Sequence, residues 1–182
     1  MILDLESPER RYIGRRRHRD LVKLPESWDP IKSTVKTMKA LIQRVKWAKV
    51  EVDGREIASI GPGLLVFLGV SAGDVEDTAG ELAGKVTRFR IFEDGDGKMN
   101  LSLNDTNGQV LVVSQFTLVA DTSRGNRPGF GQAAAPDAAR GLYELFVASL
   151  KSAGIRTKTG SFGAAMTVTL ANDGPVTFIL TK

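Results

Sequence analysis

The chain has 182 residues, of which 42% are hydrophobic, and this suffices for one domain with a single core. It contains no cysteine, so disulfide bonds, thiolate metal sites and a cysteine nucleophile are excluded, and a reducing, cytoplasmic location is expected. The net charge of +4 is uneven: nine Lys or Arg and six Asp or Glu precede Met38, which leaves the rest close to neutral.

Residues 1–37 show no sustained periodicity, and Pro25, Pro30 and many charges predict a basic, disordered N-terminal extension. Such an arm can bind nucleic acid; alternatively, translation starts at Met38. The first residues are acidic where an export signal is basic, so export is not expected. The longest apolar run, residues 63–70, is too short to span a bilayer, so no membrane partner is expected either.

From Met38 onward the pattern is that of a folded domain. Residues 38–52 alternate apolar and polar side chains and predict two strands that end at the Asp53–Gly54 turn signal. Residues 63–70 predict a buried strand. Asp74 is expected to cap a helix that reaches Arg88, and residues 90–109, rich in Gly, Asp and Asn, predict a long loop.

The second half predicts a similar alternation of strand and helix. Residues 110–120 form a buried strand that becomes polar toward its end, and a loop containing Arg124 and Arg127 follows. A helix is predicted from Pro136 to Ala153, and its buried stripe consists of Ala139, Leu142, Phe146 and Leu150. Residues 163–180 predict two strands around a turn at residues 172–175. The order β-β-β-α-β-α-β-β-β indicates an α/β domain over residues 38–182.

Several kinds of chemistry are missing from this domain. The only histidine is His18, in the extension, so the domain has no imidazole base and no Ser-His-Asp triad. No spacing suits a zinc site, and no glycine-rich nucleotide motif is present. We therefore expect neither a metal nor a cofactor.

Three polar or glycine-containing segments remain as candidates, and each has two interpretations. Residues 114–118, SQFTL, are polar at a strand end, where α/β folds commonly place sites, but these groups can also merely satisfy the backbone. Residues 172–175 form either a hairpin turn or a cis-proline that fixes a carbonyl. Residues 162–164 either admit a flat ring at Gly163 or form a tight turn.

Taken together, ordered blocks identify a family resemblance. MKALIQRV, VDG, GLLVFLGV, RIFEDGDGKMN, VLVVSQFTLVADTSRGNRPGF, LYELFV, GSFGAAMTVTL and NDGPVT resemble the D-aminoacyl-tRNA deacylases, also called D-tyrosyl-tRNA deacylases, over all of residues 38–182. The resemblance implies a β-β-(βα)2-βββ fold with a barrel-like mixed sheet and two helices. It also implies hydrolysis of D-aminoacyl-tRNA, a chiral proofreading step of translation. Trp47 and Lys49 replace small residues, and the extension has no counterpart.

The resemblance also assigns roles to residues. One wall of the pocket, including the catalytic positions, is expected at Ser114, Gln115, Phe116 and Thr117. The terminal adenosine is expected to lie on Phe162, Gly163, Ala164 and Met166. A Gly-cisPro motif, which one subunit of a homodimer inserts into the other's active site to exclude L-amino acids, is expected at Gly174 and Pro175. Support for that motif is expected from Arg44 and Asn172.

Two mechanisms fit a site without histidine. Thr117 could attack as a nucleophile, although no base is at hand to remove its proton. Alternatively, the ribose 2′-OH of the substrate assists, and the protein contributes shape and backbone donors; we favour this account. A filter that acts by rejection should admit glycine, including glycine mischarged on alanine tRNA. Competing hypotheses are a non-catalytic RNA-binding module, which would use the basic extension, Arg124 and Arg127, and an esterase for small molecules.

Overall fold

The computed structural model describes residues 37–123 and 125–182. The chain divides into two units, Met1–Val35 and Lys36–Lys182, and only the second is described below. The predictions for the extension and for Arg124 lie outside the described residues, apart from Thr37. The carbonyl of Thr37 accepts a hydrogen bond from the Ser71 hydroxyl at 2.9 Å.

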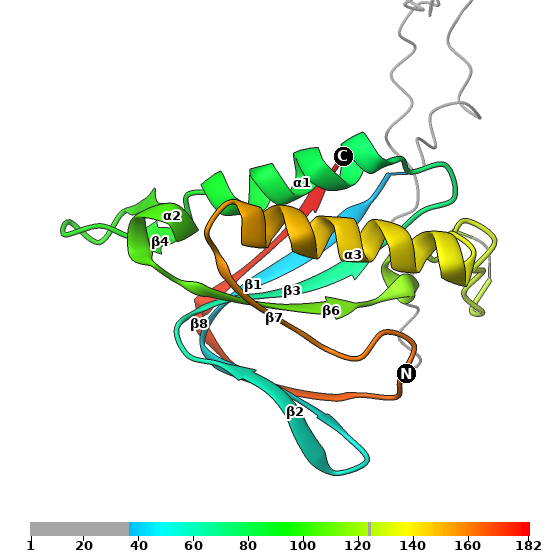
Figure 1. Ribbon diagram of the computed structural model, residues 1–182, viewed down its shortest axis with the longest axis horizontal. Coiled ribbons are helices and arrows are strands. Elements are labelled where there is room, and N and C mark those ends of the chain that lie inside the picture. The colour runs from blue at the N-terminus through cyan, green and yellow to red at the C-terminus, as the bar shows by residue number, and fades with distance from the viewer. Residues whose placement is uncertain (1–36, 124) are drawn as a thin grey trace, which may run out of the picture. The chain divides into compact units, whose positions relative to one another are not determined.

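A curved, mixed sheet forms the body of this unit (Figure 1). Its strands are β1 (Lys39–Val52), β2 (Arg55–Ile60), β3 (Gly63–Gly69), β6 (Gln109–Ser114), β7 (Arg156–Thr159) and β8 (Thr167–Thr181). They run in the order β2-β1-β3-β6-β7, and β8 pairs with β1. The pairs β3–β6 and β6–β7 are parallel, and the others are antiparallel. Because β2 and β7, at opposite ends of this order, contact each other, the sheet nearly closes into a barrel.

Each face of the sheet has its own hydrophobic core, as the alternation of side chains along a strand requires. In β3, Leu64, Val66 and Leu68 join the core under the helices, whereas Leu65 joins the core inside the barrel. The parallel neighbour β6 alternates in the same way, with Val110 and Val112 on the helix side and Leu111 and Val113 inside. The predicted buried strand at residues 63–70 is thus confirmed, and so is the one at residues 110–120 as far as Ser114, since both faces of these strands are covered.

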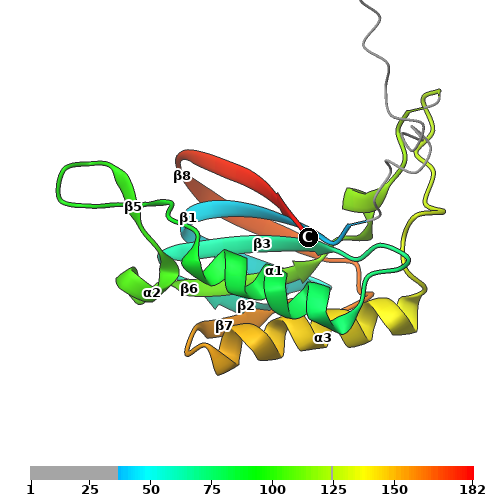
Figure 2. The ribbon, with the colours of Figure 1, turned by 90° about the horizontal axis from the view of Figure 1, so that it is seen from above.

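Two helices, α1 (Glu76–Arg88) and α3 (Pro136–Ser152), lie side by side over one face of the sheet (Figures 1 and 2). Both were predicted, with small differences. The N-cap of α1 is Val75 and not Asp74, because the Asp74 carboxylate instead accepts a hydrogen bond from the Ser71 amide at 2.6 Å. In α3, Phe146 and Leu150 are buried as expected, whereas Ala139 and Leu142 are only partly buried.

The predicted loop of residues 90–109 contains short elements that its composition did not reveal. These are β4 (Phe92–Glu93), β5 (Met99–Leu101) and α2 (Leu103–Thr106). The Asp94 carboxylate accepts hydrogen bonds from the backbone amides of Asp96 and Lys98. Asp side chains commonly stabilise turns through such hydrogen bonds to the backbone, and here they stabilise the turn between β4 and β5. A hydrogen bond from the Asn100 side chain, followed by these backbone hydrogen bonds, lowers the pKa of Asp94.

Two predicted strand pairs are single long strands. Residues 39–52 form the unbroken strand β1, and the Asp53–Gly54 turn follows it as predicted, with positive φ at both residues. Residues 167–181 form β8, so the predicted hairpin at residues 172–175 is wrong and only β7 and β8 follow α3. The reason is pairing between distant strands. β1 and β8 form an antiparallel pair along most of their length, and the register of this pair shifts around residues 172–176 of β8.

Candidate active site

The SQFTL segment lies where β6 ends, but it is not the continued strand that was predicted. β6 stops at Ser114, and a short 3-10 helix, η1 (Phe116–Val119), follows. The Gln115 amide donates to the Leu68 carbonyl at 2.8 Å, which ties the segment to the end of β3. Gly69 permits this approach, because a Cβ there would lie 2.9 Å from the Leu118 Cβ and 3.1 Å from the Gln115 carbonyl oxygen.

The predicted site residues come together around one cavity of about 520 Å³. Its lining includes three residues of the SQFTL segment and four of the predicted adenosine floor, namely Ser114, Gln115, Phe116, Phe162, Gly163, Ala164 and Met166. The cavity lies between the end of β6, the start of α3 and the loop before β8, segments distant in the chain. Thr117 does not line it; its hydroxyl accepts a hydrogen bond from the Gln115 side-chain amide.

The floor of the cavity depends on glycines. Gly163 has φ 79°, a conformation that side chains other than glycine rarely adopt. A Cβ on Gly160 would lie 2.7 Å from the Met166 sulfur, so this residue allows Met166 to turn toward the cavity. The prediction that residues 162–164 form part of a site and the prediction of a tight turn therefore both fit the same backbone.

Helix α3 contributes two residues that sequence reasoning did not identify. The Tyr143 ring packs 5.6 Å from the Phe162 ring, centroid to centroid, and its hydroxyl donates to the Val112 carbonyl at 2.9 Å. Burial raises the pKa of Tyr143 to about 12. The Arg140 guanidinium lies 4.7 Å from the Phe162 centroid. Their spacing of three residues on a predicted helix was the available signal, since it places both on one face.

The Gly174–Pro175 peptide bond is cis, and both residues are exposed. Neither lines the cavity of its own chain. Gly174 has φ 127°, and a Cβ there would lie 2.5 Å from a methyl group of Val176 and 3.2 Å from a guanidinium nitrogen of Arg44. Only glycine therefore fits at this position without a shift of its neighbours.

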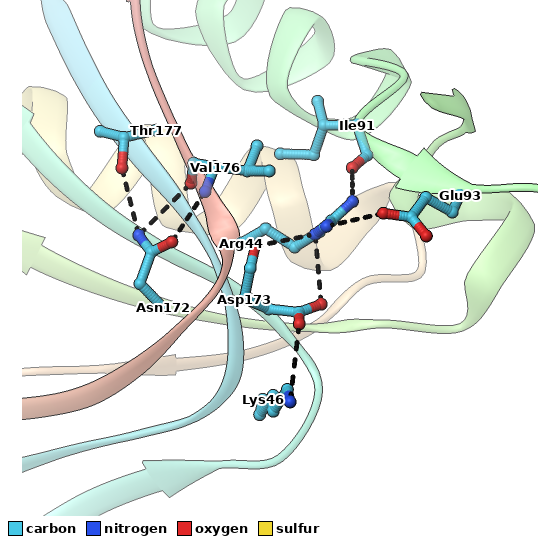
Figure 3. A network of polar contacts seen from close by, with 8 residues as sticks. All are labelled: Arg44, Lys46, Ile91, Glu93, Asn172, Asp173, Val176 and Thr177. Atoms are coloured by element: carbon cyan, nitrogen blue, oxygen red, sulfur yellow. Dashed lines mark hydrogen bonds and ion pairs between the residues drawn. The ribbon is translucent and has the colours of Figure 1, made fainter. Parts of the chain in front are cut away.

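Arg44 contacts this segment at Asp173 (Figure 3). Its buried guanidinium donates to the carbonyl of Asp173 at 3.2 Å, to the carbonyl of Ile91 at 2.8 Å and to the Glu93 carboxylate at 3.0 Å. It also lies 3.2 Å from the Asp173 carboxylate, which Lys46 approaches at 4.0 Å. The planar guanidinium thus joins β1, β8 and the strand β4 at one point.

Asn172 fixes the other side of the same segment. Its side-chain oxygen accepts from the Val176 amide at 2.7 Å, and its nitrogen donates to the Thr177 hydroxyl at 3.1 Å (Figure 3). The backbone on each side of Gly174–Pro175 is therefore held by a side chain, at Asp173 by Arg44 and at Val176 by Asn172.

Within residues 37–182, leaving out 124, no three His, Cys, Asp or Glu side chains gather as a metal site would require. None of the helices described in this range has the length and apolar character needed to cross a membrane.

Comparison with known proteins identifies the family. The model of the D-Tyr-tRNA(Tyr) deacylase family matches residues 41–181. The D-aminoacyl-tRNA deacylase of Ruegeria sp. (strain TM1040) is 56% identical over 143 residues, 79% of this chain and 92% of that protein. The D-aminoacyl-tRNA deacylase of Thermotoga petrophila is 54% identical over 143 residues, again 79% of this chain, and 96% of that protein.

Solved structures agree with these relatives in fold. The c-Myc DNA Unwinding Element Binding Protein is 40% identical with a TM-score of 0.74, over 78% of this chain and 97% of that one. A probable eukaryotic D-amino acid tRNA deacylase is 18% identical with a TM-score of 0.71, over 80% of this chain and 100% of that one, and this likeness is one of fold. The predicted fold is the fold of these solved structures, and the predicted enzyme class is that of the D-aminoacyl-tRNA deacylases of Ruegeria and Thermotoga. The chain therefore belongs to the D-Tyr-tRNA(Tyr) deacylase family, as its ordered motif blocks predicted.

Proposed function

We propose that the chain hydrolyses the ester bond of D-aminoacyl-tRNA and releases the free D-amino acid and tRNA. The observation that carries this proposal is one cavity whose lining includes residues 114–116 of the SQFTL segment and Phe162, Gly163, Ala164 and Met166. Two motif segments that are far apart in the sequence thus line one space. Its volume of about 520 Å³ falls in the range of small-ligand sites and suits an aminoacyl group with the adjoining nucleoside.

The chemistry of the cavity favours attack assisted by the substrate. In the part of the chain that the structure describes, no charged side chain and no histidine lines it. The Thr117 hydroxyl is bonded to an amide and not to a base, so no described group is placed to remove its proton. The 2′-OH of the terminal ribose stands next to the ester in the substrate itself, where it can orient and activate the water that attacks the ester carbonyl. The ribose 3′-oxygen then leaves as the hydroxyl of the tRNA, and the amino acid departs as the free acid, so no protein nucleophile is needed.

The protein's share of catalysis is then electrostatic. The backbone N–H groups of Phe116 and Thr117 donate to no acceptor among the described residues. Both belong to the segment whose start lines the cavity, and donors of this type stabilise the oxyanion that develops as the ester carbonyl is attacked. An aminoacyl ester is already reactive, so positioning and two such donors suffice.

Selection against L-amino acids is assigned to Gly174 and Pro175 of a second copy of the chain. Three observations support this: the pair is exposed, it is absent from its own cavity, and Arg44 and Asn172 hold its backbone. A rigid carbonyl in the space that an L side chain needs would reject that enantiomer with little contact to the D side chain. Glycine has no side chain to reject, so glycine mischarged on alanine tRNA is a second substrate.

The proposal is tested with D-tyrosyl-tRNA and with the same tRNA ending in 2′-deoxyadenosine, charged at the 3′ position. Wild type should release D-tyrosine from the first and bind the second while cleaving it far more slowly. Failure to cleave D-tyrosyl-tRNA would contradict the activity, whereas equal rates on both substrates would contradict the assistance of the 2′-OH.

A further inference from the structure

Arg140 is a cation that lies next to two residues of the cavity lining. It follows Ala139, a lining residue, and its guanidinium lies 4.7 Å from the centroid of the Phe162 ring, which also lines the cavity. A guanidinium over an aromatic face is attracted to it, so Arg140 has a defined place although its helix position is exposed.

The ring that carries Arg140 is itself fixed. Tyr143, one helical turn further along α3, packs on Phe162 at 5.6 Å and is anchored by its hydrogen bond to the Val112 carbonyl. Residues three apart on a helix lie on one face, so Arg140 and Tyr143 of α3 both contact the Phe162 ring. The position of the guanidinium is thus tied through Phe162 and Tyr143 to the central strand β6.

The charge of Arg140 has no partner in the described part of the chain. Asp137 and Glu144 stand three and four positions away on the same helix, yet no ion pair joins either of them to Arg140. Among the described residues, none that lines the cavity is charged. A polyanionic substrate that enters the cavity would therefore find no compensating charge in this lining, and Arg140, beside the lining residues Ala139 and Phe162, can supply it.

We propose that Arg140 binds a phosphodiester phosphate next to the terminal nucleoside of the RNA substrate. The inference rests on the proposed function, because it takes the nucleoside to lie on residues 162–166. The Arg140 guanidinium lies 4.7 Å from the ring centroid and forms no ion pair within the described residues, so its N–H donors remain available, and their fork matches two phosphate oxygens. Stacking of a base on the outer face is the competing mode, and the experiment separates the two.

Kinetics with two substrates provide the test. One is D-tyrosyl-tRNA, and the other is 3′-O-D-tyrosyl-adenosine, which has the ester and the base but no phosphate. Arg140→Ala should raise KM for the tRNA about tenfold and leave kcat nearly unchanged. It should also reduce the slope of log(kcat/KM) against log salt concentration by roughly 0.7, the value for one contact to single-stranded nucleic acid. On tyrosyl-adenosine the variant should match wild type.

Two further variants make the result specific. Arg140→Lys keeps the charge and should keep most of the salt dependence, although it loses the planar fork. Lys151→Ala removes one positive charge from the same helix about 16 Å further along its axis, and it should behave as wild type. Equal loss in Arg140→Ala and Lys151→Ala would mean that only net charge matters and would overturn the proposal.

A binding measurement keeps the inference separate from the proposed activity. A trinucleotide ending in adenosine, with its phosphodiesters but no amino acid, should bind Arg140→Ala about tenfold more weakly than wild type, whereas adenosine alone should bind both equally. This outcome supports the phosphate contact even if no ester is cleaved. A loss shared by adenosine and tyrosyl-adenosine would indicate base stacking, and unchanged binding of the trinucleotide would show that Arg140 plays no part; either would refute the proposal.

Discussion

The two mechanisms predict different results when the hydroxyl of Thr117 is removed. Because it accepts a hydrogen bond from an amide and does not line the cavity, we predict that Thr117→Ala keeps substantial activity. The loss should be about 1 to 2 kcal/mol in transition-state stabilisation, the cost of one hydrogen bond or of packing. Steady-state kcat/KM measures it. An inactive variant, together with a covalent aminoacyl intermediate trapped on wild type, would establish Thr117 as the nucleophile.

The backbone conformation of Gly174 makes its replacement by alanine costly for stability. With φ at 127° and a new Cβ only 2.5 Å from a Val176 methyl group, Gly174→Ala should destabilise the fold by about 1 to 3 kcal/mol and weaken discrimination between enantiomers. Gly80→Ala is the matched control: Gly80 lies inside α1 with open space around it, so alanine there should stabilise by about 0.5 to 1 kcal/mol. Urea unfolding compares them, and equal effects would contradict the argument.

At the scale of elements, the junction of β1, β4 and β8 depends on one guanidinium. Arg44→Lys cannot reach the Ile91 carbonyl, the Asp173 carbonyl and the Glu93 carboxylate together, so it should cost about 1 to 3 kcal/mol of stability. Lys46→Ala removes only a 4.0 Å contact from a side chain that is 72% exposed, and it should change stability by less than about 0.5 kcal/mol. Thermal unfolding of both variants checks this, and similar losses would argue against a special role for Arg44.

Prediction from the sequence failed mainly at the ends of strands and helices. Apolar runs predicted β3 and β6 because both faces of these strands are buried. The sequence did not reveal that β6 stops at Ser114, since the turn into η1 depends on the distant carbonyl of Leu68 and on the space left by Gly69. Likewise, residues 172–175 have the composition of a turn, yet pairing with β1 keeps the chain extended there.

Only part of the candidate site could be predicted, because some of its residues are brought together by long-range packing. The motif blocks identified the SQFTL segment and residues 162–164, and the fold places both on one cavity. Arg140 and Tyr143 were not identified because their spacing places them on one face of a helix but does not say that this face packs against Phe162. Contacts between distant segments are set by the packing of whole elements, and a motif does not record them.

For the whole molecule, the main expectation is a homodimer with twofold symmetry. Gly174 and Pro175 are exposed and do not line their own cavity, so a filter built from them requires a second copy. Sedimentation at micromolar concentration should give the mass of two chains, and specific activity should fall on dilution in step with dissociation. A monomer with full, enantiomer-selective activity would contradict this arrangement.

Deacylation of matched D- and L-tyrosyl-tRNA tests the central claim most directly. The account predicts that wild type releases D-tyrosine rapidly and leaves the L ester intact over the same period. The reason is that the proposed filter, Gly174–Pro175, whose flanking backbone is held by Arg44 at the Asp173 carbonyl and by Asn172 at the Val176 amide, would occupy the space of an L side chain. Comparable rates on the two esters, at equal tRNA concentration and with spontaneous hydrolysis subtracted, would contradict it.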